Sequence, residues 1–308
     1  MSLVINHNLM AMNSARNLSN SYSNLATSTR RLSSGLRVGT AADDAAGLAI
    51  RELMRADIAS LNQGVRNAND AISMIQTADG ALQVIDEKLI RMKELATQAA
   101  TGTYGSDQRL IIDSEYQAMA SEITRIANAT DFNGIYLLNG NLSSSYQNAA
   151  EWRLDHSGAG LQSRGALKIH FGTGNDSSED YYYIAIGNST ASALGVGNQS
   201  DRSISSAGFS ISTQQGAQEA LDAINTAIIS KDKIRASLGS LQNRLENTIT
   251  NLTIQAENLQ AAESRISDVD VAQEMTEFVR NQILTQSAVA MLAQANQLPQ
   301  MAMQLMQG

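Results

Sequence analysis

Residues 238–266 read LGSLQNRLENTITNLTIQAENLQAAESRI, and every seventh residue in this stretch is large and apolar. A repeat of seven predicts a helix that packs against a partner helix as a coiled coil. The only proline of the chain is Pro299, so nothing in this stretch interrupts a long helix. The repeat consists of Leu238, Leu245, Leu252, Leu259 and Ile266.

The first segment of the chain carries a similar repeat, with leucine at positions 18, 25 and 32. Gly35 and Gly39 then favour a bend. Thr40, with Asp43 three residues later, matches a capping box that predicts the start of a second helix. Capping is favoured over the alternative that Asp43 and Asp44 form a metal or acid/base pair.

The second helix continues to Gly102, and its apolar residues recur in steps of three and four. A third helix follows the glycines at 102 and 105, and its stripe suggests an antiparallel return that ends at Asp131-Phe-Asn-Gly134. The predicted core between helices consists of Leu61, Leu82, Leu89, Leu238, Leu245, Leu252 and Leu259.

The middle of the chain, residues 135 to about 213, holds most of the strand and turn signals. Ala166–Phe171 and Tyr181–Ile186 predict two strands of a small sheet, joined by a glycine-rich loop. Helical periodicity returns near Gln218.

A last helix is predicted after Ser267, an expected N-cap with Asp270 three residues later. Its apolar residues recur in steps of four and three, at Leu284, Ala288, Met291, Ala295, Leu298, Ala302 and Leu305. The fold class is therefore mainly α, with long coiled-coil helices from both termini packed as an elongated bundle and a small β-rich central segment. The predicted polymerisation seam consists of Leu18, Leu25, Leu32, Leu284, Met291, Leu298 and Leu305.

These terminal seams are narrow and flanked by Asn, Gln, Ser and Thr. Burying one leucine stabilises by about 1.5–3 kcal/mol, whereas ordering each residue costs about 1–2 kcal/mol of backbone entropy. We therefore expect the first ~40 and last ~40 residues to be largely disordered in the monomer and to fold when they pack against other subunits. Contacts of this kind that do not close into a ring produce helical filaments.

Composition excludes several classes of protein. The formal charge is −8, with 22 basic residues dispersed among 30 acidic ones, so we expect no nucleic-acid partner. The chain has no cysteine and no apolar run long enough to cross a bilayer, and the first residues do not resemble a cleaved signal peptide. Its three histidines form no H-E-x-x-H pattern, and we expect no catalysis, metal or cofactor.

Four stretches resemble the bacterial flagellins. Residues 33–50, SSGLRVGTAADDAAGLAI, resemble the N-terminal signature of that family, and Asp131–Gly134 resembles the turn after its third helix. LGSLQNRL at 238–245 and LAQANQLP at 292–299 resemble its C-terminal half.

The resemblance implies a structural subunit that polymerises into the flagellar filament for swimming. Residues 1–43 and 268–308 would form its inner core, residues 44–134 and 218–267 a helical bundle around it, and residues 135–217 a hairpin and loop segment with little or no separate surface domain. It also implies an extracellular protein exported through the flagellar type III apparatus without a cleaved signal peptide. The implied partners are copies of the same chain, an export chaperone, the filament cap and hook-associated proteins.

The second helix is similar to the site by which Toll-like receptor 5 recognises some flagellins. The matching residues include Arg91, Glu94, Leu95 and Gln98, and Glu115 falls where an acidic partner is expected. Lys93 stands where that site has arginine, and weaker recognition is expected because lysine lacks the bidentate fork. The alternative for Leu95 and Met92 is that they are simply seam residues. The favoured interpretation is that Arg91 and Glu94 mainly make subunit contacts or pair with each other.

Other functions stay open beside this one. A hook–filament junction protein resembles flagellin at its ends but occurs in few copies. An enzyme carried on the filament surface would need a catalytic constellation in the middle region. The repeats alone also suit the core of an ordinary soluble helical bundle.

Overall fold

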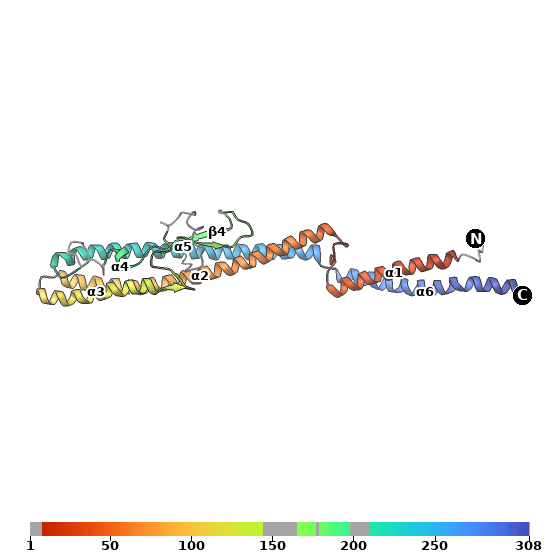
Figure 1. The fold of residues 1–308 in the computed structure, drawn as a ribbon, viewed down its shortest axis with the longest axis horizontal. Coiled ribbons are helices and arrows are strands. Elements are labelled where there is room, and N and C mark those ends of the chain that lie inside the picture. The colour runs from red at the N-terminus through yellow and green to blue at the C-terminus, as the bar shows by residue number, and fades with distance from the viewer. Residues whose placement is uncertain (1–7, 144–164, 177–178, 198–209, 308) are drawn as a thin grey trace, which may run out of the picture. The chain divides into compact units, whose positions relative to one another are not determined.

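The fold is mainly α-helical, as predicted (Figure 1). The structure is a computed structural model that describes residues 8–143, 165–176, 179–197 and 210–307. Its elements in chain order are α1 (Leu9–Ser34), α2 (Ala45–Ala100), α3 (Ser106–Ala129), β1 (Asp131–Phe132), β2 (Ile135–Tyr136), β3 (Leu167–His170), β4 (Tyr181–Ile184), α4 (Ala191–Leu194), α5 (Gln214–Ser267) and α6 (Val271–Gln307).

The contacts divide the chain into two compact units. Unit 1 comprises Met1–Ile58 and Ala256–Gly308, and unit 2 comprises Ala59–Gln255. Both boundaries fall within long helices, α2 and α5, whereas the predicted boundaries followed the breaks between helices at 43/44 and 267/268. The assignment of these parts to filament layers stays a prediction.

In unit 1, α1 and α6 lie side by side (Figure 1). The connections that precede α2 and α6 also pair with each other. Arg37 donates its backbone N–H to the Ser267 carbonyl at 2.7 Å, and Val269 donates to the Gly35 carbonyl at 3.0 Å. Because Gly35 ends α1 with a φ of 72°, a conformation that glycine adopts without strain, the chain can turn into this pairing.

The residues that cap α2 and α6 differ from the predicted ones. Asp44 accepts the N–H of Gly47 at 2.9 Å, and Asp270 accepts those of Ala272 and Gln273. The predictions of Thr40 and Ser267 as N-caps are therefore wrong. Asp43 instead accepts two hydrogen bonds from Thr40 in the preceding turn, which lower the pKa of its carboxyl group together with the nearby guanidinium groups of two arginines.

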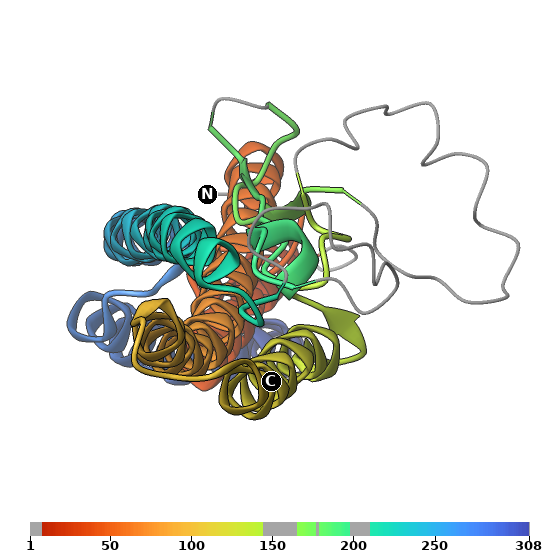
Figure 2. The same ribbon diagram turned by 90° about the vertical axis from the view of Figure 1, so that its left-hand side faces the viewer.

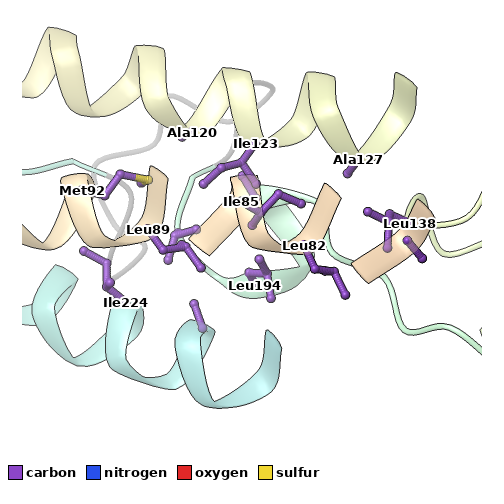
Figure 3. Packing of buried hydrophobic residues seen from close by; sticks show 14 of the residues in the cluster. Leu82, Ile85, Leu89, Met92, Ala120, Ile123, Ala127, Leu138, Leu194 and Ile224 are labelled. Carbon is purple, nitrogen blue, oxygen red and sulfur yellow. The ribbon is translucent and has the colours of Figure 1, made fainter. Parts of the chain in front are cut away.

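Unit 2 is a bundle of α2, α3 and α5, seen end-on in Figure 2, with α4 and the strands beside it. The core forms because α2 presents an apolar side chain every three or four residues. Figure 3 shows apolar side chains of this core pointing toward one another from α2, α3, α4, α5 and the segment after β2. Those labelled are Leu82, Ile85, Leu89, Met92, Ala120, Ile123, Ala127, Leu138, Leu194 and Ile224.

Two antiparallel hairpins flank this core. The strands β1 and β2 are joined by Asn133 and Gly134, both with positive φ (52° and 80°), as a tight hairpin turn requires. The strands β3 and β4 confirm the predicted sheet. Helix α5 begins at Gln214, four residues before the predicted return of helical periodicity at Gln218. The segment that leads into α5 is attached to α3, because Asp113 accepts the Ile211 N–H at 2.7 Å.

Among the described residues of unit 2, one charged side chain is buried. Lys231 of α5 is 1% exposed, and its ammonium group contacts the carboxylates of Asp86 at 2.5 Å and Asp232 at 2.8 Å. One turn further along α5, Arg235 pairs with Asp79 of α2 at 2.7 Å. Since a buried ammonium is costly without such partners, these pairs favour one register of α5 against α2.

Candidate assembly surface

The side of α1 that faces α6 has a seven-residue repeat of leucine and serine. Leu18, Leu25 and Leu32 are half-buried there, at the positions predicted for the seam. Ser14 and Ser21 alternate with them, and Ser28 is buried. At the start of α1, the Asn8 side chain donates to the Ala295 carbonyl of α6 at 2.8 Å. The pair is therefore held by a narrow and partly polar seam.

The side of α6 that faces α1 is also narrow, and it contains only part of the predicted stripe, Ala288 and Ala295. Asn281, Thr285 and Ala295 are buried there, and Ala288 and Leu292 are half-buried. Leu284 and Met291 are 48% and 59% exposed, so within one chain they do not form the α1–α6 seam. The predicted stripe therefore combines residues of both sides, and the part played by Leu284 and Met291 in polymerisation stays a prediction.

Leu298 and Leu305 belong to the helix α6, but their side chains lie outside the described ones.

Large apolar side chains also occur on the exposed surface of α6, between polar ones such as Arg280 and Gln286. At 3.6 residues per turn their positions spread around the helix and do not form one stripe. Since α1 covers one side of α6, these apolar side chains stay exposed in a single chain. We call the exposed residues of both helices the outward apolar set: Leu9, Met10, Met12, Tyr22, Val271, Met275, Val279, Ile283, Leu284, Val289, Met291 and Met301.

Six of the seven predicted core residues between helices are buried in unit 2: Leu61, Leu82, Leu89, Leu238, Leu245 and Leu252. Leu259, on the part of α5 in unit 1, is half-buried. The buried leucines face inward, in contrast to the large side chains of α6. Unit 2 therefore has an apolar core of its own.

The candidate receptor residues form a charged patch on α2 and α3. Arg91 lies 2.8 Å from Glu115 and 2.9 Å from Glu94, and all three side chains are well exposed. Hydrogen bonds to Glu115 and then Glu94 raise the pKa of Arg91, as expected of a guanidinium between two carboxylates. Gln98 donates to the Tyr104 hydroxyl at 3.1 Å beside a shallow groove of about 680 Å³.

The structure corrects the surface role predicted for Leu95 and agrees with the alternative that Leu95 and Met92 are seam residues. The Leu95 side chain is 2% exposed and belongs to the core of unit 2, because it lies one turn from Met92 on the inner side of α2. A partner that docks on the folded surface cannot contact it directly.

Other kinds of site find no support in the described parts of the chain. Among those residues, no group of three or more His, Cys, Asp or Glu side chains is arranged to hold a metal ion. No described helix combines the length and apolar character needed to cross a membrane.

Comparison with known proteins decides between two interpretations of the chain, an ordinary helical bundle and a member of the family that the sequence resembles. The pattern of the bacterial flagellin N-terminal helical region matches residues 5–143, and that of the C-terminal helical region matches residues 221–306. Flagellin FlaB2 of Treponema pallidum (strain Nichols) is 40% identical over 304 residues, which cover 99% of this chain and 100% of the relative. The chain belongs to the bacterial flagellin family.

Two further relatives match this flagellin over nearly their whole length. The flagellar filament 33 kDa core protein of Treponema phagedenis is 40% identical over 308 residues, covering 99% of this chain and 100% of the relative. The flagellin of Bacillus subtilis (strain 168) is 40% identical over 304 residues, covering 98% and 99%. The matches include the middle region as well as both ends.

Proposed function

We propose that this chain is the structural subunit of a flagellar filament, and that assembly covers the outward apolar set of α1 and α6. The observation that carries this proposal is the arrangement of α6, which directs Asn281, Thr285 and Ala295 toward α1 and leaves larger apolar residues in water. An exposed apolar surface of this extent is typical of an interaction site. Copies of the same chain are the partner that a filament supplies.

Family membership supports the same function, since the relative from Treponema phagedenis is named as a filament core protein. The role is mechanical rather than catalytic. Location in the external flagellum, export without a cleaved signal peptide, and contacts with an export chaperone, the filament cap and hook-associated proteins belong to this proposal.

Microscopy and sedimentation test the proposal. Purified protein brought to polymerising salt concentrations should form long tubes that sediment, whereas short caps or no polymer would favour the hook–filament junction protein. The Leu284→Asp variant should raise the critical concentration for polymerisation about tenfold or more, because a charge cannot be buried cheaply between subunits. The isosteric Leu284→Met variant is the control and should assemble normally.

Recognition by Toll-like receptor 5 is a second proposal. It is supported by the exposure of Arg91, Glu94, Gln98 and Glu115 around one patch on α2 and α3. In a receptor reporter assay, Arg91→Ala should reduce the response while leaving the circular dichroism spectrum unchanged. Gln83→Ala, an exposed change two turns away on α2, is the control. A response that Arg91→Ala leaves intact would contradict this second role.

A further inference from the structure

The methionines of this flagellin divide sharply by exposure. Among the methionine side chains that the structure describes, the exposed ones all lie on α1 and α6, with 45–60% of their surface accessible. Those of unit 2 are covered: Met74 and Met92 are 2% and 0% exposed, and Met119 is half-buried. Met54, on the part of α2 in unit 1, is also half-buried. We call the exposed five the terminal methionines: Met10, Met12, Met275, Met291 and Met301.

Exposure of this kind makes the thioether sulfur reactive toward dissolved oxidants. Burial protects a methionine because the oxidant must reach the sulfur, and Met74 and Met92 are closed to water. The terminal methionines have no such protection in a single chain. All five belong to the outward apolar set, so the surface proposed to bind other copies is also the one open to oxidation.

We propose that the terminal methionines are oxidation sites through which peroxides block assembly. This inference rests on the proposed function, because it requires that α1 and α6 become covered in the polymer. In the reaction, a lone pair of the sulfur attacks one oxygen of hydrogen peroxide and the O–O bond breaks as the S–O bond forms. The transferred oxygen loses its proton to the departing hydroxide, so the products are one sulfoxide and one water; the sulfur loses two electrons and the peroxide gains them.

The sulfoxide blocks assembly because of its polarity. The change replaces a flexible apolar group with a strong hydrogen-bond acceptor. In water that acceptor is satisfied, but between packed apolar helices it is left without a donor. The free-energy cost of accommodating the sulfoxide is therefore small in the free chain and large in the polymer. Enzymatic reduction of the sulfoxides makes the block reversible.

The first experiment compares the free chain with the polymer. Hydrogen peroxide is added to each, and peptide mass spectrometry follows every methionine. We expect the terminal methionines to be oxidised in the free chain well before Met74 and Met92, and more slowly in the polymer. Equal rates for Met291 and Met92 in the free chain, or equal rates for Met291 in both forms, would overturn the proposal.

The second experiment measures assembly. Oxidised chain should show a critical concentration about tenfold or more above that of untreated chain, since several unsatisfied acceptors would be buried. Treatment with methionine sulfoxide reductases should restore it. If untreated chain forms no polymer, the proposed function fails; if untreated and oxidised chains polymerise equally, only the present inference fails.

A matched pair of variants locates the effect. The variant with all five terminal methionines changed to leucine keeps apolar side chains of similar volume and should polymerise even after peroxide treatment. The control variant, Met74→Leu with Met92→Leu, should remain as sensitive as the natural chain. Loss of assembly in the oxidised five-leucine variant would place the sensitive residues elsewhere and overturn the proposal. If that variant does not assemble before treatment, recovery of the natural chain by the reductases decides the question.

Discussion

Gly64 lies on α2 where the chain near β3 crosses it, and no side chain fits between them. A Cβ atom at position 64 would lie 2.0 Å from the carbonyl oxygen of Phe171. Gly80 on the same helix has open space around it, with nothing within 4 Å of such an atom. The close contact with Phe171 therefore requires glycine at position 64, whereas no contact requires it at position 80.

The Gly64→Ala variant should lower the free energy of unfolding of unit 2 by about 1–3 kcal/mol, because backbone must move to admit the methyl group. Gly80→Ala should raise it by about 0.5–1 kcal/mol, since alanine is the better helix former. Urea unfolding followed by circular dichroism measures both. Equal effects of the same sign would show that the close contact at Phe171 does not constrain position 64.

The pairing of Asp79 with Arg235 should make unfolding depend on acid. The hydrogen bond from Arg235 holds the pKa of Asp79 below its ordinary value of 3.8. A carboxylate with a lowered folded pKa stabilises the fold above its unfolded pKa, and this contribution is lost as the pH falls through the folded pKa. The free-energy difference between natural chain and Asp79→Asn should therefore be largest near neutral pH and shrink below pH 3.8.

Urea unfolding across that pH range measures the difference. It should be modest at its largest, because both partners are about one-third exposed. Asp70→Asn, a change at an exposed aspartate on the same helix, is the control. A difference for Asp79→Asn that does not vary with pH would contradict the assigned cause.

Among single residues, the sequence predicted those whose role depends on local spacing and missed those whose partners are distant. The buried Lys231 was missed because Asp86 lies 145 positions away in the chain. The restriction at Gly64 depends likewise on Phe171. Leu95 was matched to a surface motif, but its spacing from Met92 also allowed a place on the inner side of α2, and the structure places it there.

At the scale of elements, the seven-residue repeats predicted the long helices because large side chains in a helix must find cover. In α1 and α5 the repeats correctly predicted which side of the helix packs against its neighbours, because their leucines are buried or half-buried there. On α6 the predicted stripe combines Ala288 and Ala295, which lie on the side toward α1, with Leu284 and Met291, which are exposed. Spacing alone does not say which residues of such a stripe face the neighbour in the same chain, and the role of the exposed ones in polymerisation stays a prediction.

The start of α6 provides a prediction at this scale. Asp270 accepts two N–H groups of the first turn, so Asp270→Ala should lower the free energy of opening that turn by about 0.5–2 kcal/mol. Amide exchange at Ala272 and Gln273 in the polymer, where α6 is expected to be folded, measures it. Asp270→Asn keeps a capping side chain and should behave like the natural chain. If both variants exchange alike, the side chain does not cap the helix.

At the scale of the whole molecule, the two units have different sources of stability. Unit 2 encloses a core of large apolar side chains from α2, α3 and α5, whereas in unit 1 the pairing of α1 with α6 buries mainly small and polar ones. Short seams rarely offset the entropy of ordering long helices. The expectation that the ends fold only on assembly stays a prediction, and the exposed apolar residues of α6 are the physical reason for it.

Removal of both ends should abolish assembly while leaving unit 2 folded. A chain without residues 1–40 and 268–308 should keep the cooperative unfolding of unit 2 and form no tubes in polymerising salt. Normal tubes from that shortened chain would show that other surfaces suffice.

The most direct measurement is amide hydrogen exchange of α1 and α6 in the free chain and in the polymer. If other copies cover the outward apolar set, these amides should exchange rapidly in the free chain and slowly in the polymer, while amides in the core of unit 2 stay protected in both. Equal protection of α1 and α6 in the two forms would contradict the account, because the ends would then be stable without their neighbours.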